Sequence, residues 1–211
     1  MKTRLALFGP PGAGKGTQAR LLGSRLGFTH ISTGRILRQA KREGSAIGRV
    51  ARAYIDKGRL VPDEVVYDLA ARAIADAGWD RFVLDGFPRT LAQARWLASC
   101  LDGGGAPLDS VVLMSLSDDR VVARLSRRRV HKVTGENFHL DSKPPPESER
   151  SFIIQRKDDR PEAVRERLRI YHETTRPVAD YYRRAGIMTV VDATGSFEDV
   201  HARIHGLVHA D

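Results

Sequence analysis

A glycine-rich segment near the start of the chain holds the residues best suited to binding phosphate. The run Gly9-Pro10-Pro11-Gly12-Ala13-Gly14-Lys15-Gly16-Thr17 follows a short apolar stretch, 4–8, and precedes a segment with helical character. Glycines in that setting let successive backbone N–H groups point at one anion, and the helix N-terminus adds partial positive charge. The Lys15 ammonium can bridge the β- and γ-phosphates of a nucleotide. We therefore predict a phosphate-binding loop, although the strict pattern has Ser or Thr directly after the lysine and here Gly16 precedes Thr17.

Two arginines and an aspartate lie where a second anionic ligand could bind. Phosphoryl transfer between nucleotides needs a second phosphate site that faces the first and carries positive charge. Arg89 follows Asp85-Gly86-Phe87-Pro88 at the end of a predicted strand, where α/β sheets place their ligands, and Arg38 lies on a predicted helix. From the residues alone, a solvated surface position is the alternative for both arginines, and a turn-forming role is the alternative for Asp85.

The order of motifs along the whole chain resembles the nucleoside monophosphate kinases, in their adenylate kinase form. The blocks that carry the resemblance are GPPGAGKGTQA (9–19), ISTGRILR (31–38), GRLVPDEVV (58–66), LDGFPRTLAQA (84–94), RRRVHKVTG (127–135), the long stretch 155–182 and VVDATGS (190–196). In that family a glycine after the lysine is normal. The resemblance implies reversible transfer of the γ-phosphoryl group of ATP to AMP, which gives two ADP and maintains the balance of adenine nucleotides.

The resemblance also implies a role for individual residues. Those expected to bind ATP are Gly12, Ala13, Gly14, Lys15, Gly16, Thr17, Arg124, His139 and Ser196. Those expected to bind AMP are Thr33, Arg38, Arg59, Val61, Gly86, Arg89, Gln93, Arg156 and Arg167. The catalytic set is Lys15, Asp85, Arg89, Arg128, Arg156 and Arg167. Mg²⁺ enters with ATP, and Asp85 holds it through water, without a direct protein ligand. Arg124 stacks on the ATP adenine opposite His139, and Thr33 and Gln93 read the AMP base.

Several details refine this resemblance. Ser-Thr-Gly at 32–34, together with Thr90 and Gln93, is similar to the AMP enzymes and unlike the UMP/CMP enzymes. The predicted lid, 130–158, lacks CxxC pairs, so we expect no structural zinc; its hydrogen-bonded substitute starts with His131 and Thr134, and its second half is not identifiable from the sequence. Arg35 stands where the family usually has Asp. Its side chain could turn inward to phosphate or outward, and we expect outward because Arg38 and Arg89 already serve the acceptor.

The elements that must position these residues alternate between strand and helix. Strands are predicted at 4–8, 81–84, 110–116 and 187–191, with a short apolar segment at 28–31; helices are predicted at 14–26, 34–42, 45–57, 62–77, 90–100, after Ser117, at 161–184 and after Ser196. Ser45 and Ser117 are the expected N-caps of their helices, and Ser196 with Asp199 is expected to form a capping box. This alternation predicts an α/β fold: a doubly wound parallel P-loop sheet flanked by helices. We expect one domain, 1–211, with a core (1–31, 62–129, 159–211), a helical NMP-binding segment (32–61) and the inserted lid.

Composition limits the remaining possibilities. The 211 residues carry a net charge of +9, which favours polyanionic partners, but we attribute the excess mainly to base composition in the source genome, so charge alone does not define the function. Cys100 is the only cysteine, the chain has no apolar run of about 20 residues, and its start lacks a signal-like stretch, so we expect a cytoplasmic monomer that binds ATP, AMP and ADP. Alternatives are a P-loop kinase for sugar- or shikimate-type acceptors and a nucleotide-dependent nucleic-acid-binding protein; few aromatic residues disfavour the latter.

Overall fold

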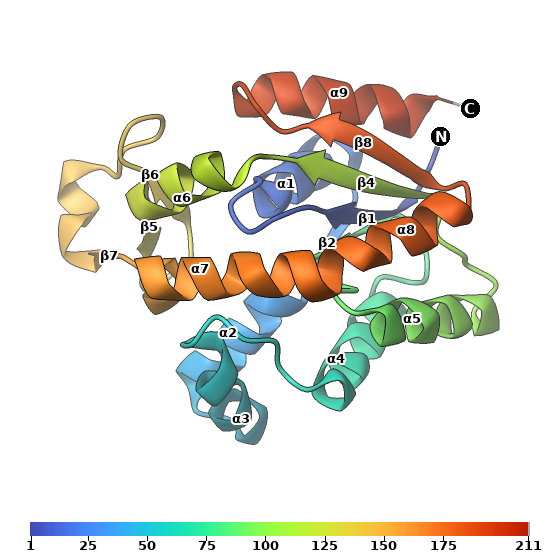
Figure 1. Cartoon of the computed structure of the whole chain (residues 1–211), viewed down its shortest axis with the longest axis horizontal. Helices are drawn as coiled ribbons and strands as arrows, with labels where there is room; N and C mark the ends of the chain where they lie inside the picture. The colour runs from blue at the N-terminus through green and yellow to red at the C-terminus, as the bar shows by residue number, and fades with distance from the viewer. Residues whose placement is uncertain (211) are drawn as a thin grey trace.

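Five parallel strands form the central sheet of the computed structural model, which describes residues 1–210 (Figure 1). Their spatial order is β2-β3-β1-β4-β8. The strands are β1 (Arg4–Phe8), β2 (Thr29–Ser32), β3 (Phe82–Asp85), β4 (Ser110–Ser115) and β8 (Met188–Asp192). Strands β1 and β3 consist mostly of buried apolar residues, as expected for a parallel sheet that helices cover on both faces. The predicted α/β class and parallel topology are confirmed, apart from shifts of one or two residues at strand ends. Asp211, the last residue of the predicted domain, lies outside the described part.

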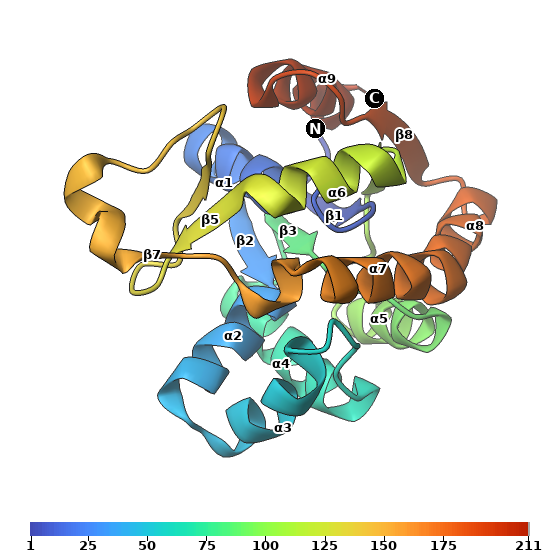
Figure 2. The same cartoon turned by 60° about the vertical axis from the view of Figure 1, so that its left-hand side comes forward.

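Helices cover both faces of this sheet. On one face lie α1 (Lys15–Leu26) and α9 (Phe197–His209); on the other lie α4 (Asp63–Asp76), α5 (Leu91–Gly103) and α8 (Arg176–Arg184) (Figures 1 and 2). Each face has its own apolar cluster, one including Leu22 and Ile204, the other including Ile74 and Leu97. No helix among residues 1–210 has the length and apolar character needed to cross a bilayer.

The register of the sheet brings the predicted phosphate loop and Asp85 together. Asp85 is the last residue of β3, and it pairs with Leu7 of β1 on one side and with Ser32 of β2 on the other. The phosphate loop leaves the end of β1, and the NMP-binding segment leaves the end of β2. Three functional segments therefore start from neighbouring strand ends at one edge of the sheet.

The predicted NMP-binding segment forms a helical hairpin, α2 (Thr33–Glu43) and α3 (Ala46–Ile55), that projects from the sheet (Figure 2). The Ser45 hydroxyl accepts from the Gly48 N–H (3.2 Å), which confirms Ser45 as the N-cap. A Cβ atom at Gly48 would lie 2.0 Å from the Ala40 carbonyl oxygen, so a glycine is required where the two helices cross. The helix ends at Ile55, earlier than the predicted Lys57.

The predicted lid contains a small antiparallel sheet of order β6-β5-β7. Its strands are β5 (Arg128–His131), β6 (Asn137–His139) and β7 (Ile153–Ile154), and a 3₁₀ turn, Glu147–Phe152, precedes β7. Helix α6 (Asp118–Arg127) leads into it. Strands of two to four residues are too short to show a hydrophobic alternation, which is why the sequence shows no periodicity here.

Two helix predictions need correction. The single helix expected over 161–184 is instead α7 (Pro161–Ile170), a π-helical turn (Tyr171–Thr175) and α8. Pro177 near the start of α8 has no N–H and cannot continue the regular ladder, so the chain widens before it. Ser117 does occupy the N-cap of α6, but its side chain makes no capping hydrogen bond. The predicted capping box of Ser196 and Asp199 is present at the start of α9.

Candidate active site

One large cleft of about 1970 Å³ opens along the strand ends, between the phosphate loop, the lid sheet and the hairpin. The predicted site residues that line it are Gly12, Ala13, Gly14, Lys15, Gly16, Thr17, Arg38, Asp85, Gly86, Arg89, Arg124, Arg128, His139, Arg156, Arg167 and Ser196. A smaller recess adjoins it, lined among others by Thr33, Arg38, Arg59, Val61, Gly86, Arg89, Gln93 and Arg167. The fold thus brings together every residue of the predicted set.

The geometry of the phosphate loop explains why two of its positions are glycine. Gly9 has φ 137°, and a Cβ atom there would lie 2.4 Å from the carbonyl oxygen of Met114. A Cβ atom at Gly16 would lie 3.0 Å from Asp85 Oδ2. The extra glycine between Lys15 and Thr17 therefore lets the Asp85 carboxylate lie directly against the start of α1.

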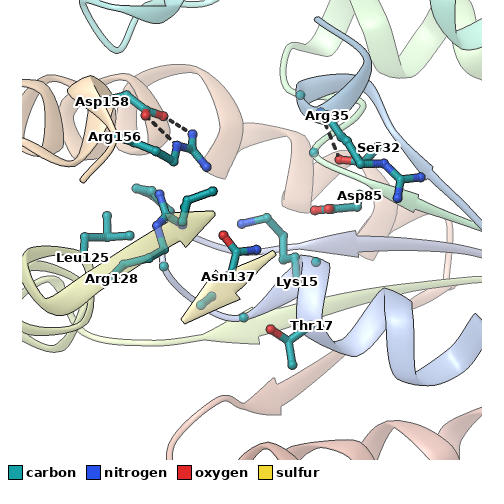
Figure 3. A pocket seen from close by; sticks show the side chains of 18 of the residues that line it. Lys15, Thr17, Ser32, Arg35, Asp85, Leu125, Arg128, Asn137, Arg156 and Asp158 are labelled. Carbon is teal, nitrogen blue, oxygen red and sulfur yellow. Dashed lines mark hydrogen bonds and ion pairs between the residues drawn. The ribbon is translucent and has the colours of Figure 1, made fainter. Parts of the chain in front are cut away.

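Lys15 reaches back over its own loop. Its Nζ donates to the carbonyl oxygens of Gly9 (2.7 Å) and Pro10 (2.8 Å). Burial lowers the pKa of Lys15 to about 7, against the opposing influence of the Asp85 carboxylate. Figure 3 shows the ammonium directed into the space between Asp85 and Arg128. A phosphate bound in that space would lie beside Lys15 and would favour its charged form.

The Asp85 carboxylate has a partner that the sequence analysis did not identify. Asp85 Oδ2 lies 3.2 Å from His30 Nε2. Burial would raise the pKa of Asp85, but the hydrogen bond with His30 and the charge of Lys15 outweigh burial and hold that pKa at about 2. Asp85 is therefore ionised at neutral pH. The available signal was positional: His30 lies two residues before Ser32 on a strand next to that of Asp85, so both side chains point to one face.

Two buried carboxylates hold three arginines in the cleft. Arg128 Nε donates to Asp159 Oδ2 (2.7 Å), and Arg156 Nε donates to Asp158 Oδ1 (2.8 Å; Figure 3). Arg167 Nη1 donates to the backbone oxygen of Asp158 (3.0 Å) and lies 3.4 Å from Asp159 Oδ1. Burial lowers the pKa of Arg167 to about 10, so it stays charged at neutral pH. The arginines are thus positioned by protein contacts alone.

Arg89 and Arg38 lie on the side of the cleft where the acceptor phosphate is predicted to bind. Arg89 Nε donates to the Gly86 carbonyl oxygen (2.8 Å), and Thr33 Oγ1 donates to the same oxygen (3.3 Å). Burial lowers the pKa values of both arginines, and nearby Arg156 lowers them further. Both therefore occupy the cleft, and the solvated surface alternative does not apply to either. Such desolvated positive charges favour binding of an anion.

The predicted ATP-adenine pair lies at the far end of the cleft. Arg124 Nη2 donates to the Ala193 carbonyl oxygen (2.9 Å), and burial lowers its pKa. His139 Nδ1 lies 3.3 Å from the N–H of Asp141, so this nitrogen accepts and the ring orientation is fixed. Stacking of the adenine between Arg124 and His139 remains a prediction. Ser196 lines the cleft, while its hydroxyl caps α9.

The lid, which contains no cysteine, holds a cluster of side chains around His131. His131 Nδ1 accepts from the N–H groups of Val133 (3.2 Å) and Thr134 (3.1 Å). The ring of Phe152 stacks on His131 with centroids 5.2 Å apart and planes at 21°, and the Lys132 ammonium lies 5.1 Å from the Phe152 centroid. Phe152, which the sequence analysis did not single out, therefore packs against His131 and Lys132 and joins their hydrogen-bonded turn to the start of β7.

Arg35 lies at the rim of the site. Its side chain is exposed, and its Nη2 donates to the His30 carbonyl oxygen (3.1 Å). Figure 3 shows the guanidinium turned away from Lys15, beyond Asp85. Arg35 still lines the cleft, but its guanidinium lies apart from those of Arg128 and Arg156, with Asp85 between it and Lys15.

The donor atoms of the cleft suit a metal that arrives with a nucleotide. Within residues 1–210 no group of three or more His, Cys, Asp or Glu side chains is arranged to hold a metal ion. The cleft does present the Asp85 carboxylate and the Thr17 hydroxyl, both oxygen donors (Figure 3). Mg²⁺ in phosphoryl-transfer sites typically uses one or two carboxylates, waters and substrate phosphates. The residues present fit that arrangement.

Comparison with known proteins agrees with this geometry. The family model described as adenylate kinase matches residues 7–187. An adenylate kinase of Salinibacter ruber is 53% identical over 208 residues, covering 98% of each chain. Adenylate kinases of Acidothermus cellulolyticus and Archaeoglobus fulgidus are 44% and 41% identical, covering 95% and 97% of each chain. The match spans the phosphate loop, the acceptor side and the lid together, and the chain belongs to the adenylate kinase family.

Proposed function

We propose that the chain catalyses the reversible reaction of ATP with AMP to give two ADP. The observation that carries this proposal is a single cleft with two positively charged phosphate sites. One is the loop around Lys15, the other is formed by Arg38 and Arg89, and both line the same cavity. The family is named for this reaction, and the relatives that share the full length of the chain carry the same name.

The reaction needs little covalent help from the protein. An oxygen of the AMP phosphate, ionised at neutral pH, attacks the γ-phosphorus, and the bond from that phosphorus to the β,γ-bridging oxygen breaks. The loop N–H groups and Lys15 hold the donor phosphates, and Arg38 and Arg89 align the nucleophile. Arg128, Arg156 and Arg167 stabilise the charge on the equatorial oxygens of the group in transit.

Magnesium has a defined place in this proposal. When bound with ATP it neutralises charge on the β- and γ-phosphates and so favours departure of ADP. Asp85 would hold it through water, and Thr17 offers a hydroxyl on the same side of the cleft. The lid strands carrying Arg128 and His139 would cover the donor and exclude water from the phosphoryl group.

The base pockets distinguish this function from that of other small kinases. Thr33 and Gln93 line the recess beside Arg38 and Arg89, where the acceptor base would lie. Arg124 and His139 line the opposite end, where the donor base would lie. We also propose that the enzyme is a monomer that acts in the cytoplasm; the single cysteine, which allows no internal disulfide, fits a reducing compartment.

A coupled assay with ATP and a panel of acceptors tests the proposal. We expect AMP to be the preferred acceptor among AMP, UMP, CMP, a hexose and shikimate. The donor ATP and the acceptor AMP should then each be converted to ADP. A bisubstrate analogue of two adenosines joined by five phosphates should bind far more tightly than ATP, because both sites are filled at one cost of association. Preference for another acceptor, or analogue affinity equal to that for ATP, would contradict the assignment.

The variant Lys15→Ala tests in the same assay whether Lys15 takes part in the transfer. It should still fold, with only a small change in melting temperature from the loss of the hydrogen bonds to the Gly9 and Pro10 carbonyl oxygens, and it should lose transfer. If the variant keeps more than about a tenth of the wild-type kcat, the assignment of Lys15 as a catalytic residue is wrong.

A further inference from the structure

We infer that Asp63 is a positioning residue that fixes the Gln93 amide in one orientation, so that the acceptor pocket selects 6-aminopurine over 6-oxopurine monophosphates. The inference rests on the proposed function, in which Gln93 contacts the acceptor base. Asp63 itself is the first residue of α4, two residues after the end of the NMP-binding segment, and Gln93 lies in the first turn of α5.

Both carboxylate oxygens of Asp63 accept hydrogen bonds from residues at the start of α5. Oδ1 accepts from Gln93 Nε2 (2.6 Å), and Oδ2 accepts from Thr90 Oγ1 (3.0 Å). The Thr90 hydroxyl in turn accepts from the Gln93 backbone N–H (3.1 Å) and caps the helix. These contacts connect the start of α4 to the residue that lines the acceptor recess.

The Gln93 amide has a second partner, of opposite hydrogen-bonding character. Gln93 Oε1 accepts from the backbone N–H of Arg89 (2.7 Å). An ionised carboxylate can only accept, and a backbone N–H can only donate. Exchanging the amide O and N would set oxygen against oxygen at Asp63 and N–H against N–H at Arg89. Since Gln93 is 2% exposed, water cannot relieve either conflict. The chemistry of the two neighbours therefore allows one orientation.

This orientation has a direct consequence for the base. Gln93 retains one N–H donor on Nε2 and one lone pair on Oε1 for a ligand, in a fixed order. Adenine offers a matching pair, the N6–H donor beside the N1 or N7 acceptor. A 6-oxopurine has an acceptor at position 6, with either N1–H or N7 beside it. A 6-oxopurine that presents O6 and N1–H would bind only if the amide exchanged its O and N ends. One that presents O6 and N7 would set an acceptor against Gln93 Oε1, so the fixed amide disfavours both.

The test compares AMP with inosine monophosphate, which differs from AMP in having O6 and N1–H. We expect wild-type kcat/KM with ATP to favour AMP strongly. Asp63→Asn keeps the shape but offers Gln93 either a donor or an acceptor, so that only the Arg89 N–H still opposes exchange of the amide ends. Removal of one of the two conflicts should lower the AMP-to-inosine-monophosphate ratio about tenfold or more. The KM for ATP should not change. If D63N does not fold, Asp63→Ser should give the same fall, because a hydroxyl also both donates and accepts.

Two controls separate this role from a structural one. Glu64→Gln removes the neighbouring, exposed carboxylate from the same helical turn and should leave the ratio unchanged. In a Gln93→Ala background, D63N should have no further effect on the ratio, because the amide it positions is gone.

Three results would overturn the inference: a wild type that accepts both monophosphates equally, a D63N ratio within twofold of wild type, or an equal fall in E64Q. Each of these leaves AMP phosphorylation itself in place. Failure of the wild type to phosphorylate AMP would instead contradict the proposed function, so the two failures are distinct.

Discussion

Lys15 should take up a proton when Mg·ATP binds. In the free protein, burial and the neighbouring arginines lower its pKa to about 7, although Asp85 opposes this. Bound phosphates place negative charge beside the ammonium and should return the pKa to the ordinary lysine range or above. A pKa that rises on binding means that binding takes up protons and that affinity falls as the pH rises through 7.

The size of the effect follows from that pKa. With a value of about 7, the free Lys15 is about nine-tenths protonated at pH 6, half at pH 7 and one-tenth at pH 8. Proton uptake per ATP should therefore be about 0.1, 0.5 and 0.9 at these three pH values. The affinity for Mg·ATP should fall about tenfold from pH 6 to pH 8, which corresponds to about 1.4 kcal/mol.

Isothermal titration calorimetry measures this uptake directly. Binding heats are recorded at each pH in two buffers of different ionisation enthalpy, without AMP, and the slope gives the protons taken up. Lys15→Arg is the matched control, because its guanidinium stays charged throughout and should take up none. Uptake below about 0.1 at pH 7 and pH 8 would refute the reasoning, and so would equal uptake by the arginine variant, since the proton would then belong to another group.

Further predictions concern the metal and the lid. Arg35→Asp should restore a carboxylate near Asp85 and lower the Mg²⁺ concentration for half-maximal rate, without changing the KM for AMP; a rise of about tenfold in that KM would show that Arg35 binds phosphate. Phe152→Ala removes the stack on His131 and should destabilise the lid by about 1 kcal/mol, which should speed amide exchange in the lid strands and raise the KM for ATP. Val133→Ala, at an exposed position, should have none of these effects. Chelators should leave the melting temperature of the nucleotide-free protein unchanged but stop transfer; a clear drop in melting temperature would reveal a structural metal.

The parts of the fold that could be predicted from the sequence have local causes. The strand, glycine loop and helix of residues 4–26 follow one another without a gap, so apolar runs and glycines mark them directly. Ser45 and the Ser196 capping box are equally local signals, and both are confirmed. The resemblance added the order of the site segments, which is why every expected site residue lines either the cleft or the recess beside it.

The features that the sequence did not reveal depend on contacts between distant residues. His30 and Asp85 are 55 residues apart, and their side chains can be seen to meet only once the pairing of β2 with β3 is known. Phe152 would be read as an exposed aromatic near Pro144–Pro146, and its role appears only when β7 pairs with β5 and brings it over His131. Strands this short have no sequence period, so their partners are set by tertiary packing.

The contacts among charged groups explain why so basic a cleft can be stable and still act on phosphate. Asp158 is 7% exposed and Asp159 is 1% exposed, and each binds an arginine of the cleft through at least one hydrogen bond under 3 Å. Arginine charges buried without partners would repel one another at a high cost. With the carboxylates behind them, the guanidinium groups keep fixed positions and leave donors free toward the cleft. Little reorganisation is then needed when negative charge develops on the phosphoryl group, and that is the condition under which electrostatic stabilisation is most effective.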